Sequence, residues 1–187
     1  MYYHASSVKG IKTLEPRISN HNIPLIYFSE KRENVLVYLS NAVEKFCNET
    51  DFNYSGVWHK WASYGFDKDG ILNLEEYYSN ALIDTYKGVS GYIYSAEKVN
   101  NSGDTINVPY AVTSREKVTV SGCEFIDDAY EEIIKAEENG LIRITRYESL
   151  SDAKRNWIAE IMKKEYETAS EHPEYRYFIE NKFGVRN

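Results

Sequence analysis

Two short segments near the N-terminus carry aromatic and imidazole side chains in a pattern suited to holding a ligand ring. Residues 2–6, YYHAS, contain His4, and residues 25–40, LIYFSEKRENVLVYLS, contain Tyr27 and, eleven residues later, Tyr38. Stacking on a tyrosine ring contributes about 1 kcal/mol beyond simple burial. The chain has 17 tyrosines among its 187 residues, so two tyrosines at this spacing are expected by chance. The evidence for a ligand site therefore comes from the flanking IYF and from the early histidine.

Two glutamates in a later segment could supply a carboxylate. Glu116 opens EKVTVSGCEFI, residues 116–126, and Glu124 follows eight residues later. A carboxylate stabilises positive charge that develops in a transition state, and it can orient or activate an incoming nucleophile. Both glutamates are candidates on these grounds.

The segment IYFSE, residues 26–30, resembles a strand end of the ADP-ribosyltransferase superfamily, in particular its diphtheria-toxin-like and poly(ADP-ribose)-polymerase-like branch. In that branch a histidine on the first core strand precedes this strand end, and a helix with a second tyrosine follows at the same offset as Tyr38. The start of the chain is also similar to small bacterial enzymes that ADP-ribosylate rifamycin antibiotics.

This resemblance implies NAD as substrate, with transfer of ADP-ribose to an acceptor and release of nicotinamide. Tyr27 and Tyr38 would sandwich the nicotinamide ring, and His4 would hydrogen-bond the adenosine ribose and orient NAD. The family places its catalytic carboxylate at the start of a late strand, and this register favours Glu116 over Glu124.

Tyr110 and Ser114, on the preceding predicted strand, are weaker candidates for the pocket wall. The family usually has glycine after the histidine, where the lack of a side chain allows close backbone approach, but this chain has Ala5. Ala5 and the choice between two glutamates favour the alternative of a non-enzymatic binding or regulatory protein with a degenerate pocket. A third possibility is an unrelated α+β protein whose tyrosines are structural.

Hydrophobic periodicity and turn residues predict an α+β fold, and the resemblance implies a split antiparallel β-sheet core with flanking helices and a helical C-terminus. We expect an α+β domain over residues 1–150 and a helical extension over 151–187 packed on the same domain. Neither GxGxxG nor GxxxxGK occurs, so no Rossmann fingerprint or P-loop is present. The expected strands cover residues 1–5, 25–29, 91–99, 106–114, 116–126 and 141–148, and the expected helices cover 29–48, 75–88, 127–140 and the chain from 151, broken at His172-Pro173.

Residues 54–74 predict β-structure that turns on Asp69-Gly70, because Asp-Gly between apolar runs favours a hairpin. The same residues partly match a calcium-binding EF-hand loop, in which Glu76 would be the bidentate ligand. Gly65 stands where the first carboxylate ligand should be. The hairpin is therefore the favoured interpretation, and we expect no metal site.

The formal net charge is −7, and no basic stripe offers phosphate contacts, so strong nucleic-acid binding is not expected. Cys47 and Cys123 match no metal or redox spacing and are expected to be free thiols. The first ten residues, MYYHASSVKG, do not read as a signal peptide, and no apolar run is long enough for a membrane span. We therefore expect a cytoplasmic protein without a membrane partner, and the acceptor of ADP-ribose stays open.

Overall fold

The computed structural model describes residues 1–18, 23–56, 63–104 and 108–185, and the chain forms two compact units. Unit 1 comprises Met1–Leu39, Phe66–Leu72 and Gly88–Ile142, and unit 2 comprises Ser40–Gly65, Asn73–Lys87 and Arg143–Asn187. The C-terminal helices thus share a unit with two earlier segments, which differs from the expected division at residue 150. Within the described residues, no helix is long and apolar enough to cross a membrane.

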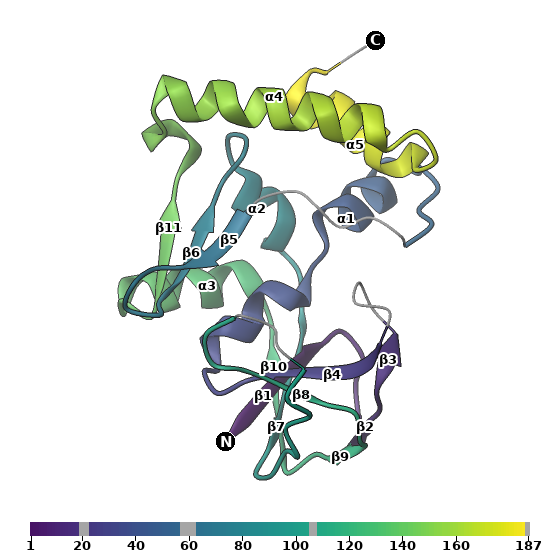
Figure 1. Cartoon of the computed structure of the whole chain (residues 1–187), viewed down its shortest axis with the longest axis vertical. Helices are drawn as coiled ribbons and strands as arrows, with labels where there is room; N and C mark the ends of the chain where they lie inside the picture. The colour runs from purple at the N-terminus through teal and green to yellow at the C-terminus, as the bar shows by residue number, and fades with distance from the viewer. Residues whose placement is uncertain (19–22, 57–62, 105–107, 186–187) are drawn as a thin grey trace. The chain divides into compact units, whose positions relative to one another are not determined.

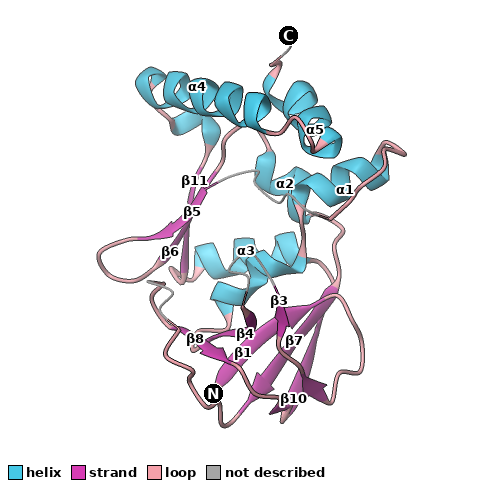
Figure 2. Ribbon diagram, turned by 45° about the vertical axis from the view of Figure 1, so that its right-hand side comes forward, coloured by secondary structure: helices cyan, strands magenta, loops and turns pink. Residues whose placement is uncertain are grey.

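Unit 1 is built on a six-stranded sheet in the order β10-β7-β1-β4-β3, with β8 also pairing with β4 (Figures 1 and 2). Every strand pair described in this sheet is antiparallel. The prediction of an α+β fold with an antiparallel sheet is confirmed. The strands are β1 (Tyr2–Ser6), β3 (Arg17–Ile18), β4 (Pro24–Ser29), β7 (Gly91–Ala96), β8 (Ala111–Ser114) and β10 (Gly122–Ile126), and a separate pair joins β2 (Thr13–Leu14) to β9 (Val118–Thr119).

The sheet opens between β1 and β4. Among the described residues these two strands share one register pair, Tyr3 with Ser29, whereas β1 and β7 are paired from Tyr2 to Ser6. Past Tyr3, the backbone of β1 therefore separates from that of β4.

The two faces of the sheet have different surroundings. Side chains alternate between faces along a strand, so Ala5, Ile93 and Glu124, which are joined by register, lie on one face. A 3-10 helix, η1 (Glu33–Leu39), packs against β1 and β7 and against α3 (Ala129–Glu138). The opposite face carries a buried apolar cluster made of Leu14, Ile26, Phe28, Ala96, Val112 and Val118.

The contact between η1 and the sheet depends on a glycine. A Cβ atom built on Gly91 would lie 2.6 Å from Cδ2 of Leu39, and it would lie 3.3 Å from the carbonyl oxygen of Ser6. A side chain at this position would push η1 away from β7. Gly91 therefore sets how closely the helix that carries Tyr38 approaches the sheet.

The prediction of a single helix over residues 29–48 is wrong. The structure instead has η1 followed by α1 (Ala42–Glu49), with extended backbone at Asn41. The Asn41 side-chain oxygen accepts hydrogen bonds from the backbone amides of Val43 and Glu44. Asparagine is a strong N-cap residue, so it starts a new helix rather than continuing the first. The break also coincides with the boundary between the two units.

The hairpin predicted at Asp69-Gly70 is confirmed over the residues described. Strands β5 (Ser63–Phe66) and β6 (Leu72–Glu75) pair, and β11 (Ile142–Thr145) completes a three-stranded sheet. An Asp67 carboxylate oxygen accepts from the amides of Asp69 and Ile71, which fixes the turn. Residues 57–62 of the predicted β-region lie outside the described residues.

The helix predicted for residues 75–88 is shorter than expected, because α2 spans only Ala81–Tyr86. The buried carboxylate of Glu76 accepts from the amide of Leu82 at 3.0 Å and from the amide of Tyr147 at 3.2 Å. It therefore hydrogen-bonds both the start of α2 and the chain after β11. Both carboxylate oxygens that an EF-hand would offer to calcium already accept backbone amides. Gly88, with φ of +73°, follows the helix as predicted.

The remaining helices begin and end close to the predicted residues. Asp128 caps α3 through the amides of Tyr130 and Glu131, and Gly140 follows it with φ of +71°. In unit 2, α4 (Asp152–Thr168) and α5 (Pro173–Phe183) are separated at His172-Pro173 and pack on each other (Figure 1). The predicted strand 116–126 is divided into β9 and β10, and of the predicted strand 106–114 only β8 forms, with residues 105–107 outside the described residues.

Candidate functional site

His4 occupies the opening between β1 and β4. Its Nδ1 atom lies 2.8 Å from the carbonyl oxygen of Tyr27, and its ring packs against Phe28 with centroids 5.9 Å apart. A carbonyl oxygen only accepts hydrogen bonds, so Nδ1 is the donor and Nε2 of the neutral ring remains an acceptor. Burial lowers the pKa of His4 from its ordinary value, the hydrogen bond to Tyr27 opposes this, and the Arg17 charge lowers it slightly further.

The two predicted ring-stacking tyrosines both lie in unit 1. Tyr27 is half-buried in the middle of β4, where it pairs with Thr113 of β8. Tyr38 lies near the end of η1 with 55% of its surface exposed. The structure thus brings Tyr27 and His4 into direct contact through the Tyr27 carbonyl, and places Tyr38 on the helix that follows β4.

Glu116 lies in the turn between β8 and β9. Its carboxylate accepts from the Nδ2 atom of Asn100 at 2.8 Å, and its backbone amide and carbonyl both hydrogen-bond the Ser114 hydroxyl. Ser114 pairs with Ile26 near the start of β4. Glu116 is therefore tied to the end of β4 that is remote from η1.

A surface groove of about 560 Å³ surrounds Glu116 in unit 1. Its wall carries hydroxyl, charged and apolar side chains from the segment that follows β7 and from the chain between the end of β8 and the start of β10. The lining residues are Glu97, Lys98, Asn100, Ser114, Glu116, Lys117, Val118, Thr119, Val120 and Ser121. Ser114 lines this groove, and its hydroxyl also shapes the turn.

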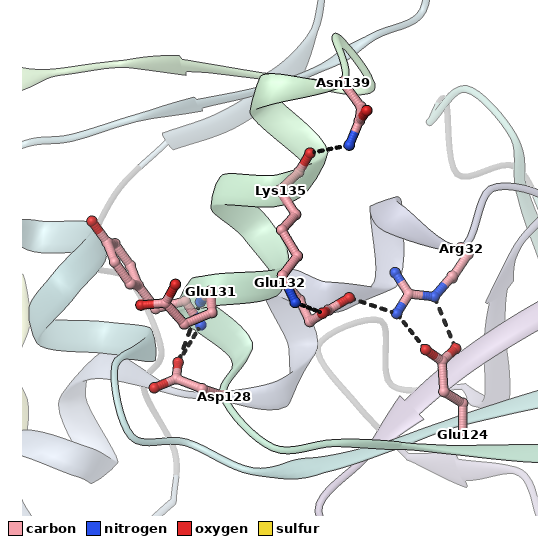
Figure 3. A network of polar contacts seen from close by, with 8 residues as sticks. Arg32, Glu124, Asp128, Glu131, Glu132, Lys135 and Asn139 are labelled. Atoms are coloured by element: carbon pink, nitrogen blue, oxygen red, sulfur yellow. Dashed lines mark hydrogen bonds and ion pairs between the residues drawn. The ribbon is translucent and has the colours of Figure 1, made fainter.

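Glu124 is bound by an arginine from the segment between β4 and η1 (Figure 3). Arg32 donates from Nε to Glu124 Oε2 at 2.8 Å and from Nη2 to Oε1 at 2.6 Å. Nη2 also donates to Glu132 Oε2 of α3 at 2.9 Å, and the Lys135 ammonium donates to the other Glu132 oxygen at 2.9 Å. These contacts connect the edge strand β10 and helix α3 to the segment that links Tyr27 to Tyr38.

The ion pairs shift the pKa values of two members of this network. The hydrogen bond to Glu124 raises the pKa of Arg32 further above its already high value, against the effect of partial burial. The Lys135 hydrogen bond lowers the pKa of Glu132, burial opposes this, and Arg32 lowers it further. Both groups are therefore held in their charged forms.

Tyr110 contacts the other side of the segment after β4. Its carbonyl oxygen accepts from the Glu30 amide at 2.9 Å, and the Lys31 ammonium lies 4.1 Å from its ring centroid. Its backbone has φ of +63°, a conformation that costs energy in a residue with a side chain. Tyr110 thus helps to position Glu30 and Lys31. The sequence alone predicts only a place for it in the pocket wall.

Asn34, on η1, is a buried polar residue whose side-chain amide is unsatisfied among the described residues. Its side chain is 5% exposed, and neither Nδ2 nor Oδ1 has a hydrogen-bond partner among the described residues. Most buried amides in native structures are satisfied. Neither Asn34 nor Arg32 stands out in the sequence, because both lie among charged and polar residues that resemble an exposed helix start.

The described residues contain no cluster of three or more His, Cys, Asp or Glu side chains that could hold a metal ion. No protein-family model, no curated protein and no solved structure matches this chain. The evidence for a function therefore lies in the geometry of the candidate site. That geometry offers a neutral imidazole acceptor on the face that carries Phe28, and, on the face of Ala5 and Ile93, a carboxylate held by a guanidinium, with two tyrosines in adjoining elements.

Proposed function

We propose that unit 1 binds NAD and transfers its ADP-ribose to an acceptor, with release of nicotinamide. The observation that carries the proposal is the His4–Tyr27 contact at the opening between β1 and β4. It joins the two segments on which the family resemblance rests. The fixed Nδ1–H tautomer leaves Nε2 available to accept a hydrogen bond from a ribose hydroxyl.

In the proposed reaction the bond between nicotinamide and ribose C1 breaks, and its electron pair leaves with nicotinamide. The ribose develops positive charge, which a nearby carboxylate stabilises. A nucleophilic atom of the acceptor then bonds to C1, and its proton passes to that carboxylate or to solvent. Tyr27 and Tyr38 would stack the nicotinamide ring and hold it in place.

The contacts support Glu124 better than Glu116 as the carboxylate. Arg32 links Glu124 to the segment between the two tyrosines. Glu124 also shares a register row with Ile93 and Ala5, on the face of the sheet against which η1 packs. Glu116 contacts the opposite end of β4 through Ser114, and we retain it as the second candidate.

A second candidate function is a non-enzymatic NAD-binding module. The observation that favours it is the bidentate contact of Arg32 with both oxygens of Glu124. A guanidinium in this position offsets the negative charge that the reaction requires. Such a protein would bind NAD without releasing nicotinamide.

Thermal unfolding with and without millimolar NAD, with nicotinamide release assayed on the same sample, tests both functions. A ligand at about 100 times its Kd stabilises a protein by about 2.7 kcal/mol, which raises Tm by several degrees in a chain of this size. We expect such a rise, its loss in Tyr38→Ala, and its retention in Tyr64→Ala. Tyr64 is a suitable control because it is 45% exposed and lies in unit 2.

Each result has a distinct meaning. A rise in Tm with nicotinamide release supports the transferase, and a rise without release supports the binding module. The absence of any change in Tm with NAD contradicts both.

A further inference from the structure

The contact between Arg32 and Glu124 conflicts with the role proposed for Glu124. A carboxylate that stabilises a developing cation must present its negative charge to the substrate. In the structure both of its oxygens instead accept from one guanidinium, at 2.8 and 2.6 Å. For Glu124 to act on a sugar ring, Arg32 has to leave it.

Arg32 has the accessibility and the geometry to exchange partners. Its side chain is 29% exposed, and the side chains of Glu124 and Glu132 are 50% and 24% exposed. Ion pairs at such exposure contribute little net stability. The planar guanidinium offers several donors in a fixed fork, which matches phosphate oxygens as well as carboxylate oxygens.

The neighbouring charges allow this exchange without stranding a carboxylate. Glu132 keeps the Lys135 ammonium as a partner at 2.9 Å when Arg32 moves away. Glu124 is half-exposed and can be hydrated, or can face the substrate. Arg32 can therefore leave both of its carboxylate partners in the network of Figure 3, because Glu132 keeps Lys135 and Glu124 can be hydrated.

We propose that Arg32 is a binding residue for a diphosphate group and that this binding releases Glu124. The inference rests on the proposed function, in which the ligand is a dinucleotide carrying a diphosphate between its two riboses. Arg32 lies between Tyr27 on β4 and Tyr38 on η1, next to the proposed nicotinamide site. The ligand's own anionic group would therefore free the carboxylate, so that Glu124 becomes available only when substrate is bound.

The test measures binding of inorganic pyrophosphate and of ADP-ribose by calorimetry, with the Nε–H signal of Arg32 followed by NMR. We expect Arg32→Ala to weaken binding of both by about tenfold or more, which corresponds to the loss of a charge-assisted contact. Arg115→Ala is the matched control, because Arg115 makes a similar two-point contact with Asp104 in the same unit. We expect it to bind both ligands as the unchanged protein does.

Glu132→Gln supplies a readout that a purely structural Arg32 would not produce. Glu132 competes with the ligand for Nη2 of Arg32, so its neutralisation should strengthen pyrophosphate binding several-fold. An unchanged or weaker affinity in Glu132→Gln overturns the inference. So does equal affinity in Arg32→Ala, or no pyrophosphate binding by the unchanged protein.

Failure of the inference can be told apart from failure of the proposed function. NAD-dependent nicotinamide release that is insensitive to Arg32→Ala leaves the function standing and removes the role of Arg32. Pyrophosphate binding that depends on Arg32, without nicotinamide release from NAD, leaves a diphosphate site and removes both the transferase and the release of Glu124.

Discussion

The Nδ1 atom of His4 lies 2.8 Å from the carbonyl oxygen of Tyr27, where the backbones of β1 and β4 no longer pair. The imidazole thus satisfies a carbonyl group that an unbroken antiparallel ladder would have satisfied with a backbone amide. The hydrogen bond links β1 to β4 beyond their last register pair and leaves Nε2 as an acceptor.

His4 predicts a pH dependence of stability. Its pKa in the folded chain lies below 6.5 because burial disfavours the charged ring. The unfolded chain therefore takes up the proton first as pH falls, so the free energy of unfolding falls with it below about pH 6.5. The contribution of His4 is fully present above that pH and is lost towards its folded pKa.

Urea unfolding from about pH 7.5 to about pH 5 measures this dependence. The His4→Asn variant keeps an amide donor near the position of Nδ1 but does not titrate, so its stability should fall less over the same range. Equal pH profiles for the two proteins would show that His4 does not experience the buried environment described.

The two candidate carboxylates predict different effects on turnover. Glu124→Gln should lower nicotinamide release about 100-fold or more, because the neutral amide no longer stabilises the developing cation. Glu116→Gln should leave release within about twofold, since its carboxylate contacts Asn100 at the other end of β4. The reverse pattern in the same assay would assign the catalytic role to Glu116.

Two asparagines seven residues apart should respond in opposite directions to leucine. Asn34→Leu replaces an unsatisfied buried amide with an apolar group of similar size, and should raise the free energy of unfolding by about 1 kcal/mol. Asn41→Leu removes the N-cap of α1 and should lower it by about 1 kcal/mol. Chemical denaturation of both variants measures the signs, and a destabilised Asn34→Leu would contradict the description of that amide as unsatisfied.

Substitution of Glu76 should lower the stability of the chain, and calcium should not change the stability of either the variant or the unchanged protein. Glu76→Gln replaces one of two oxygens that accept buried backbone amides, and should cost about 1–3 kcal/mol. Glu75→Gln, which loses the ion pair with Lys154, should cost about 1 kcal/mol or less. Thermal unfolding compares the two, and a rise in Tm on addition of calcium would restore the EF-hand interpretation.

Local chemistry predicted much of the fold. The turn at Asp69-Gly70 and the end of the helix at Gly140 each depend on residues within a few positions of one another. The break at His172-Pro173 is of the same kind, because proline cannot continue a helix and readily starts one. Such features follow from the sequence because no distant part of the chain is needed to form them.

Features that depend on distant partners could not be predicted in this way. The apolar spacing across residues 29–48 favours one helix, but the Asn41 cap divides it. Arg32 and Glu124 are 92 residues apart, and they meet only because of the order of strands in the sheet. The register of residues 116–126, read against the family resemblance, favours Glu116, but a single segment gives no information on which carboxylate lies near the segment after β4.

The interleaving of the two units has a consequence for the order in which the protein can fold during synthesis. In unit 2, Cys47 of α1 contacts Glu174 of α5 across 127 positions, and Phe46 packs on Phe178 with ring centroids 5.7 Å apart. The apolar face of α1 therefore leaves the ribosome long before its partner helix is made. Until then that face has no partner from α5, and neither unit can be exchanged between proteins as one uninterrupted stretch of gene.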